Sequence, residues 1–223
     1  MKKILVTIDG PAGAGKTTVS RAVALELGYT YVDTGALYRG LAVIVNQKGV
    51  DPNDDEALAA VCKELELSLI PEEDKTRVIA NGEDITDKLR TPEISMTASA
   101  VSARPLVREW LLGIQREFGE KGGAVFEGRD MGTVVFPNAE AKFFLHADPN
   151  IRARRRHQEL LEKGLAVTEE DVAKDMEKRD KDDSSRAVAP LKPAEDAILV
   201  DSSQLNIEEA VWVILDWVKK KLK

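Results

Sequence analysis

The sequence predicts an α/β fold built around a parallel β-sheet, and three neighbouring segments carry this prediction. Residues 3–9 form a short run rich in β-branched side chains that ends at glycine, which is typical of a buried strand. Residues 16–27 show the apolar spacing of an amphipathic helix, and residues 29–33 indicate a second strand. Two strands joined by a helix over so short a stretch run parallel, with a right-handed crossover.

The middle of the chain departs from this pattern. Residues 66–70 and 76–86 indicate short strands, and Asn81-Gly82 predicts a type I′ hairpin. Because a hairpin is antiparallel, this region is expected to be an insertion and not a continuation of the parallel sheet. Helices are expected on both sides of it, over residues 37–48, 55–66 and 92–118.

The second half of the chain returns to alternating strands and helices. The last helix is expected to begin near Asn206, because Asn206 and Glu209 are spaced to form a capping box. With 223 residues, the chain is long enough for one α/β domain with an insertion, or for two small lobes. Strands are expected over residues 124–127, 142–146 and 197–201, and helices over about 149–163 and 168–181.

Composition argues against several classes of function. The formal net charge of -7 disfavours a dedicated nucleic-acid binder, which needs a positive surface. No apolar run approaches the ~20 residues that span a bilayer, and the apolar residues before Asp9 are too few for a signal peptide. Cys62 is the only cysteine, which fits a reducing cytoplasm, and the two histidines form no cluster with it that would bind zinc.

The strongest local motif is a predicted phosphate-binding loop between the first strand and the first helix. Its glycines allow a tight turn that brings backbone N–H groups against phosphate oxygens, and the helix N-terminus adds a partial positive charge. Lys16 is then expected to bridge the β- and γ-phosphates of ATP, and the Thr17 hydroxyl to ligate Mg²⁺. The match to G-x-x-x-x-G-K-[ST] is Gly10-Pro11-Ala12-Gly13-Ala14-Gly15-Lys16-Thr17.

Arginines follow two of the predicted parallel strands, at the sheet edge where ligands bind. Arg39 follows the strand that ends at Asp33, and Arg129 follows the strand that ends at Glu127. When the phosphoryl acceptor is itself a phosphate, two anions must approach each other, so arginines are needed to neutralise them. Two arginines in matching positions favour a second anion site over two solvated surface charges.

Further arginines lie on the basic helix expected over about 149–163. Helical spacing places Arg152, Arg155 and Arg156 on one side of it. We interpret this helix as part of a mobile lid whose arginines close on the ATP phosphates and exclude water. A solvated helix face and an RNA-binding patch are the alternatives, and the acidic chain as a whole weighs against both.

Four stretches resemble the bacterial cytidylate kinase family, and the likeness runs over almost the whole chain. They are Ile8-Asp9-Gly10-Pro11, Asp33-Thr34-Gly35-Ala36 with Tyr38-Arg39, Gly128-Arg129-Asp130-Met131-Gly132-Thr133-Val134-Val135-Phe136-Pro137, and Arg186-Ala187-Val188-Ala189-Pro190-Leu191. The resemblance implies a P-loop NTPase-type parallel sheet of five strands flanked by helices. It also implies a core over residues 1–64 and 106–223, a small insert that binds the nucleoside monophosphate over residues 65–105, and a short lid over about 150–165.

The same resemblance implies roles for individual residues. Lys16, Arg39, Arg129 and Arg155 would act in phosphoryl transfer, while Thr17 would ligate Mg²⁺ directly and Glu127 would contact it through water. The loop that binds ATP would comprise Gly10, Pro11, Ala12, Gly13, Ala14, Gly15, Lys16, Thr17 and Thr18. The acceptor site would comprise Thr34, Arg39, Ser99, Arg108, Arg129, Asp130, Arg179, Asp183 and Arg186, with Asp182 as an adjacent competitor to Asp183.

The chemistry of cytosine agrees with the implied base site. Asp130 could accept a hydrogen bond from the exocyclic amine, while Arg108 and Ser99 could donate to the ring nitrogen and the carbonyl. Uracil reverses the donor and acceptor at the 4-position and at N3. A carboxylate that faces the 4-position would therefore oppose UMP.

The loop and the resemblance together imply a kinase that transfers the γ-phosphoryl group of ATP in line to CMP or dCMP, with Mg²⁺. The family further implies a monomer, while the composition favours a cytoplasmic protein without a nucleic-acid or membrane partner. A kinase of the same fold that acts on shikimate, gluconate or AMP is one alternative. A nucleotide-dependent switch such as a small GTPase is another, although the sequence has no Asn-Lys-x-Asp guanine motif.

Overall fold

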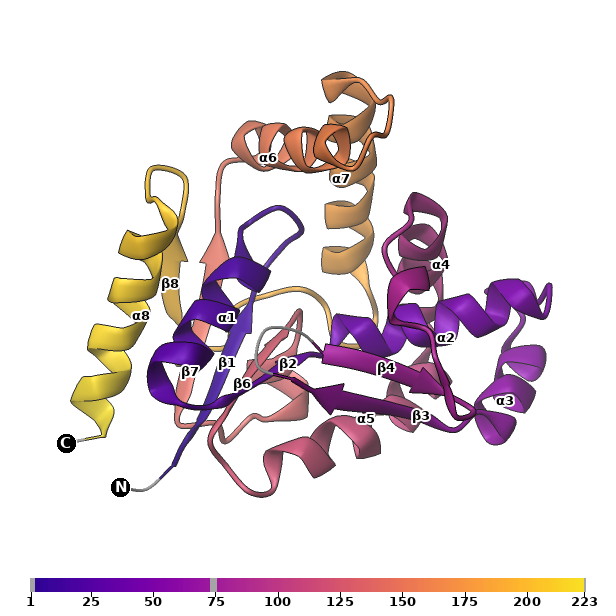
Figure 1. Ribbon diagram of the computed structural model, residues 1–223, viewed down its shortest axis with the longest axis horizontal. Helices are drawn as coiled ribbons and strands as arrows, with labels where there is room; N and C mark the ends of the chain where they lie inside the picture. The colour runs from indigo at the N-terminus through magenta and orange to yellow at the C-terminus, as the bar shows by residue number, and fades with distance from the viewer. Residues whose placement is uncertain (1–2, 73–75, 223) are drawn as a thin grey trace.

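The computed structural model describes residues 3–72 and 76–222 (Figure 1). Its centre is a five-stranded sheet in the order β2-β6-β1-β7-β8, in which every neighbouring pair is parallel. The parallel five-stranded sheet predicted above is therefore confirmed. Its strands are β1 (Leu5–Asp9), β2 (Thr30–Asp33), β6 (Ala124–Gly128), β7 (Ala141–His146) and β8 (Ile198–Asp201).

Helices cover both faces of this sheet. One face carries α1 (Lys16–Leu27) and α8 (Ile207–Lys221), and the other carries α2 (Gly35–Gln47) and α5 (Pro105–Gly119). The interior strand β6 shows why both faces are buried. Phe126 points into the core shared with α2 and α5, whereas its neighbour Val125 points into the core shared with α1 and α8. A strand that is apolar on both faces is typical of a parallel sheet between helical layers.

A second, antiparallel sheet of three strands lies beside this core. Asn81 and Gly82 join its last two strands with φ angles of 49° and 82°, as a type I′ turn requires. The predicted hairpin is therefore confirmed, and the segment expected as a strand over 76–86 is two strands with this turn between them. The elements are β3 (Leu67–Pro71), β4 (Thr76–Ala80) and β5 (Glu83–Asp84), followed by the single turn η1 (Thr86–Lys88).

Two helices follow the antiparallel sheet, whereas the sequence pattern predicts a single helix over residues 92–118. The first is α4 (Pro92–Ser102), and the helical conformation is interrupted at Arg104 before α5 begins. Pro105 causes the break, because proline lacks an N–H and keeps Arg104 extended at φ −86° and ψ 122°. α4 packs along α2, while α3 (Asp55–Glu64) packs against α5.

The helices α6 (Pro149–Glu162) and α7 (Glu169–Ser185) pack together above the turn that joins β1 to α1 (Figure 1). α7 continues beyond the predicted end at residue 181, so Asp183 lies within the helix. The two helices share a small apolar cluster that includes Ala153, Leu160, Val172 and Met176. This cluster fixes α7 against α6, and α7 in turn reaches down toward the carboxyl ends of the strands.

The last helix begins where the sequence predicts. Asn206 and Glu209 exchange both hydrogen bonds of a capping box at the start of α8. None of the helices within residues 3–72 and 76–222 has the length and apolarity that a membrane span requires.

Candidate active site

One large cleft opens at the carboxyl ends of the parallel strands, the edge at which sheets of this kind bind ligands. Its volume is about 960 Å³, at the upper end of the range for small-molecule sites. Its walls come from the turn after β1, the start of α2, the helix α4, the segment after β6, and the helices α6 and α7. The cleft therefore gathers residues that lie far apart in the sequence.

The turn between β1 and α1 lines one end of the cleft. Gly10 has φ 147°, and a Cβ at this position would lie 1.9 Å from the carbonyl oxygen of Leu145, so only glycine fits. Gly15 is the N-cap residue of α1 in the left-handed conformation, and no side chain caps the helix. The first N–H groups of α1 are thus left for an external acceptor, an arrangement that suits phosphate.

Lys16 is the cationic side chain of this turn, and it is almost completely buried. Its ammonium donates to the carbonyl oxygen of Pro11 at 2.6 Å. Burial lowers the pKa of Lys16 to about 7, with further lowering from Arg129 and partial opposition from Glu127. An anion bound beside the ammonium would reverse this shift, so the site favours a highly charged anion such as a polyphosphate.

Two oxygen ligands for a hard cation lie beside Lys16. The Thr17 hydroxyl donates to Oε1 of Glu127 at 2.9 Å, and Glu127 is buried at the end of β6. Among the residues that the structure describes, no three His, Cys, Asp or Glu side chains converge as a metal cage. A hydroxyl with one carboxylate fits Mg²⁺, which usually takes few protein ligands and completes its octahedron with phosphate and water.

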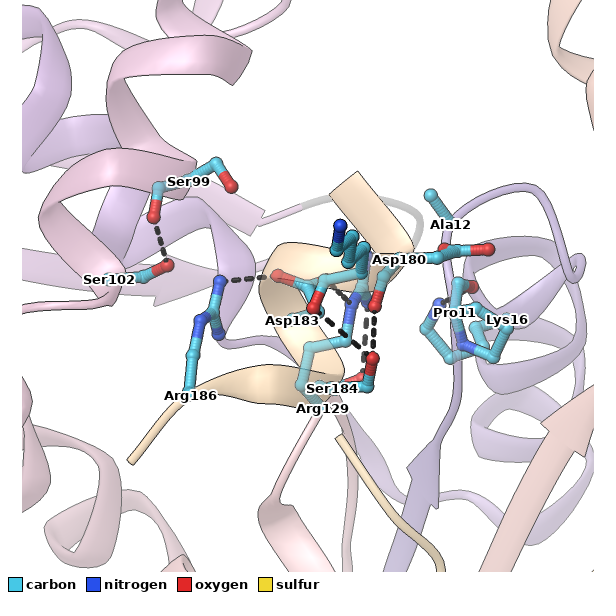
Figure 2. A network of polar contacts seen from close by, with 12 residues as sticks. Pro11, Ala12, Lys16, Ser99, Ser102, Arg129, Asp180, Asp183, Ser184 and Arg186 are labelled. Atoms are coloured by element: carbon cyan, nitrogen blue, oxygen red, sulfur yellow. Dashed lines mark hydrogen bonds and ion pairs between the residues drawn. The ribbon is translucent and has the colours of Figure 1, made fainter. Parts of the chain in front are cut away.

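A cluster of arginines lines the other end of the cleft and converges on one carboxylate of α7. Figure 2 shows Asp183 between Arg129 and Arg186: Arg129 donates through Nε at 3.0 Å, and Arg186 donates through Nη2. Burial alone would raise the pKa of Asp183, but the two guanidinium groups hold it below its usual value. Burial and the charge of Arg129 lower the pKa of Arg179 to about 10. An anion bound here would offset the repulsion between these guanidinium groups.

Arg39 completes this arginine cluster from a different element. It lies on α2, where its Nη2 donates to Asp33 at 2.6 Å. Its buried Nε has no hydrogen-bond partner in the structure. Arg39 thus lines the same cleft as Arg129 and Arg186.

The residues expected to read a cytosine ring lie together at the α4 side of the cleft. Arg108 forms a buried ion pair with Asp130 and also donates to the carbonyl oxygen of Ser102 at 3.1 Å. The Arg108 guanidinium lies 5.6 Å from the centre of the Tyr38 ring, and Ser99 lines the adjacent wall. The site thus presents one carboxylate and one guanidinium side by side, as a base with a neighbouring donor and acceptors requires.

The arginines of α6 are divided between two environments. Arg155 lines the cleft and donates through Nη2 to the carbonyl oxygen of Ser202 at 2.7 Å. Arg156 also lines it, paired with Glu159 at 2.7 Å. Arg152 is buried instead, where it donates to the carbonyl oxygen of Ala12 at 3.1 Å and pairs with Asp180 at 2.6 Å. The expectation that Arg152 faces the ATP site with the other two is therefore wrong, because it supports the phosphate turn from behind.

Nearly all of the predicted site residues line this one cleft. Gly10 and Pro11 do not, since Gly10 packs against β7 and Pro11 contributes its carbonyl to Lys16. Asp182 is exposed outside the cleft, while its neighbour Asp183 lies within it. The residues gathered there are Ala12, Gly13, Ala14, Gly15, Lys16, Thr17, Thr18, Thr34, Arg39, Ser99, Arg108, Glu127, Arg129, Asp130, Arg155, Arg179, Asp183 and Arg186.

Three residues of the site go beyond the sequence prediction. Asp33 pairs with Arg39, Tyr31 contacts Glu127, and Asp9 accepts from the backbone N–H groups of Met131 and Gly132 at 2.9 and 2.8 Å. Burial raises the pKa of Asp9 to about 7, although these two hydrogen bonds oppose the shift. The sequence could have pointed to these residues only through their position, because all three lie on β1 or β2, the strands that lead into the cleft.

The parallel sheet, the phosphate turn and the facing arginines define a P-loop kinase for a small acceptor. Residues 6–220 match the family model described as Cytidylate kinase. The chain belongs to the cytidylate kinase family.

Individual relatives agree over the full length of the chain. A cytidylate kinase of Syntrophotalea carbinolica is 44% identical over 220 residues, which cover 99% of this chain and 94% of the relative. A cytidylate kinase of Halalkalibacterium halodurans is 45% identical over 222 residues, which cover 100% of both. The solved structure of a shikimate kinase from Bacteroides thetaiotaomicron matches with a TM-score of 0.51 at 12% identity, over 98% of this chain and 99% of that one, and it supports the fold alone.

Proposed function

We propose that this chain transfers the γ-phosphoryl group of ATP to CMP or dCMP, giving ADP and CDP or dCDP. The observation that carries the proposal is one cleft with two facing anion sites, the phosphate turn with Lys16 and the arginine cluster around Asp183. An oxygen of the acceptor phosphate attacks the γ-phosphorus, and the bond from that phosphorus to the oxygen bridging the β-phosphate breaks. Each product keeps one of the two oxygens, and no covalent enzyme intermediate is required.

On the donor side, the backbone N–H groups at the start of α1 and the Lys16 ammonium would hold the β- and γ-phosphates. Mg²⁺, when bound, would supply positive charge beside the phosphates. Thr17 would ligate the metal through its hydroxyl, and Glu127 would accept hydrogen bonds from its water shell. The distance of 2.9 Å between these two side chains supports a shared role.

On the acceptor side, Arg39, Arg129 and Arg186 would bind the CMP phosphate and offset its repulsion of the γ-phosphate. In the structure each of them donates to a carboxylate, Asp33 or Asp183. Binding therefore involves an exchange in which phosphate oxygens take over some of these hydrogen bonds. The acceptor phosphate is largely ionised near neutral pH, so the chain needs no general base.

The cytosine ring would bind beside Asp130, Arg108 and Ser99, with Asp183 and Arg179 toward the ribose and Thr34 near the nucleotide. The Arg108–Asp130 pair supports this proposal, because its donor and acceptor match the cytosine edge. The insert over residues 65–105 would contribute Ser99 to the base site, and the lid over about 150–165 would bring Arg155 onto the donor phosphates. The proposal further includes action as a monomer in the cytoplasm.

The arginines of α6 give little support to RNA binding. Arg152 is buried, Arg155 and Arg156 face the cleft with partners, and only Arg154 is largely exposed, at 75% of its side-chain surface. A helix that binds RNA would present these charges together on an open face.

A coupled assay of ADP release tests the proposal directly. The acceptors CMP, dCMP, UMP, AMP and shikimate would be compared side by side with ATP and Mg²⁺. We expect CMP and dCMP to give the highest kcat/KM, and UMP to fall well below them because Asp130 opposes its 4-carbonyl. Preferred turnover of shikimate or AMP would refute the proposed acceptor while leaving the phosphate turn in place.

A further inference from the structure

Glu127 is hydrogen-bonded at both carboxylate oxygens, although only one of them faces the phosphate turn. Oε1 accepts from the Thr17 hydroxyl at 2.9 Å, and Oε2 accepts from the Tyr31 hydroxyl at 2.6 Å. Both Tyr31 and Glu127 are buried, with 4% and 8% of their surface exposed. The contact joins neighbouring strands of the sheet, since β2 and β6 are paired over this stretch.

Tyr31 is suited to act as a permanent donor. Its hydroxyl is the donor of the 2.6 Å bond to Oε2, because an ionised carboxylate only accepts hydrogen bonds. Its ring lies 5.4 Å below the guanidinium of Arg21, which fixes the ring from the α1 side. The Tyr31 hydroxyl donates to Oε2, so Oε1 is left to accept from the Thr17 hydroxyl.

We propose that Tyr31 is a positioning residue for the magnesium site. It holds Oε2 of Glu127 so that Oε1 stays directed at Thr17 and at the water shell of the metal. The inference rests on the proposed function, because it concerns the Mg²⁺ that accompanies ATP. Groups that orient a ligand from behind commonly change metal affinity by about 10- to 100-fold when removed.

The physical reason lies in the length of the glutamate side chain. The glutamate carboxylate is joined to Cβ through a methylene group, so the side chain has one more rotatable bond than aspartate. The carboxylate would lose its fixed orientation if one of its oxygens had no hydrogen-bond partner. Tyr31→Phe removes only the hydroxyl and keeps the ring in the core. The change therefore separates the hydrogen bond to Glu127 from the packing of the strand.

Tyr29 provides a matched control in the same part of the chain. Its hydroxyl accepts from the backbone N–H of Ile4 at 3.2 Å, at the start of β1 and away from the cleft. Tyr29→Phe removes a tyrosine hydroxyl and one hydrogen bond without touching Glu127. Any general effect of losing such a bond on the sheet appears in this variant as well.

Calorimetric titration with ATP, with and without Mg²⁺ and with no acceptor present, tests the inference on the full chain. For the original protein we expect Mg²⁺ to tighten ATP binding. In Tyr31→Phe that gain should fall by about 10-fold, while metal-free ATP binding stays within about twofold. Tyr29→Phe should leave both values unchanged. In a Glu127→Ala background, adding Tyr31→Phe should cause no further loss, because the acceptor of the Tyr31 hydroxyl is already gone.

The outcomes separate this inference from the function on which it rests. If Mg²⁺ raised the ATP affinity of Tyr31→Phe as much as that of the original protein, the role of Tyr31 would be overturned and the kinase proposal would stand. If Tyr31→Phe lost the same ATP affinity with and without the metal, the positioning role would also be overturned, because such a loss would indicate that Tyr31 only supports the fold. Additive losses in the double variant would have the same meaning. If the original protein showed no Mg²⁺ gain, the magnesium assignment would fail, and this inference with it.

Discussion

The two ends of the cleft present different groups to a bound anion. At the phosphate turn the groups are backbone N–H donors and Lys16, whose hydrogen-bond partner is the carbonyl oxygen of Pro11. At the other end the groups are guanidinium side chains already paired with carboxylates, above all Arg129 and Arg186 with Asp183. The first end is ready for a polyphosphate, while the second must exchange partners when its ligand arrives.

This difference indicates how each end selects its ligand. Backbone donors fixed by the sheet recognise any phosphate chain of the right shape, so they contribute affinity and alignment with little discrimination. Arginines that must leave a carboxylate bind only a ligand that offers an equivalent set of acceptors. Selection between substrates should therefore depend on the arginine end, and the rate of transfer should depend on both ends.

The largest effect is expected for Lys16→Ala, which removes the cation from the donor end. The turnover number should fall by about 100- to 1000-fold, because charge on the transferring phosphoryl group loses a positioned donor. The far-ultraviolet circular dichroism and the melting temperature should remain close to those of the original protein. Lys174→Ala serves as the control, since Lys174 is an exposed residue of α7 paired with Glu170. Near-normal turnover in Lys16→Ala would contradict the assigned role.

A smaller effect is expected for Arg186→Ala at the acceptor end. The KM for CMP should rise by about 10- to 100-fold, as expected from the loss of a charge-assisted hydrogen bond. The KM for ATP should change little, because the phosphate turn is untouched. Steady-state kinetics with each substrate varied would measure both values, and Arg154→Ala would show the effect of removing an exposed arginine. Equal increases in the two KM values would contradict the division between the ends.

The base site should respond to Asp130→Asn by a change in selectivity. The amide can donate to the 4-carbonyl of uracil, so the ratio of kcat/KM for CMP to that for UMP should fall by about tenfold. Part of this change would come from weaker use of CMP, because the pairing with Arg108 also loses its charge. Competition between the two acceptors in one reaction measures the ratio directly. An unchanged ratio would place the selection of the base elsewhere.

The smallest effect is a proton taken up when ATP binds. The pKa of Lys16 is lowered to about 7 in the free protein, and phosphate beside the ammonium should raise it again. At about pH 8 the free side chain is mostly neutral, so binding should take up a fraction of one proton, whereas at about pH 6 it is already charged and this uptake should vanish. Calorimetry in buffers with different ionisation enthalpies measures the uptake. The same uptake at pH 8 in Lys16→Ala would assign it to another group.

Most of the fold is predictable because its signals are local. The alternation of short apolar strands with amphipathic helices predicts the parallel sheet, and Asn81-Gly82 predicts the hairpin of the second sheet. The break before Pro105 is also a local signal, and it follows from the restricted backbone of the preceding residue. The extension of α7 to Ser185 is not local, because its last turn is held by the ion pairs of Asp183 with Arg129 and Arg186.

The candidate site is less accessible to sequence reasoning than the fold. Motif spacing and family likeness lead to the residues that line the cleft, but not to their partners. Arg152 and Arg155 are one helical turn apart, yet one lies behind the phosphate turn and the other faces the cleft. That division depends on how α6 packs against the rest of the protein, which is a matter of tertiary structure and not of local sequence. Tyr31 and Asp9 act through side chains across the sheet, and no linear motif records such pairs.

The bond from Asp9 to the segment after β6 has a consequence for the spacing of the two anion sites. Asp9 is the last residue before the phosphate turn, and its carboxylate grips two consecutive N–H groups directly after Arg129 and Asp130. Asp9 ends β1, and Met131 and Gly132 lie in the short helical segment that follows β6, so neither side of this contact belongs to α6 or α7. The distance between the phosphate turn and the segment that carries Arg129 and Asp130 is thus set by one side chain of the sheet scaffold.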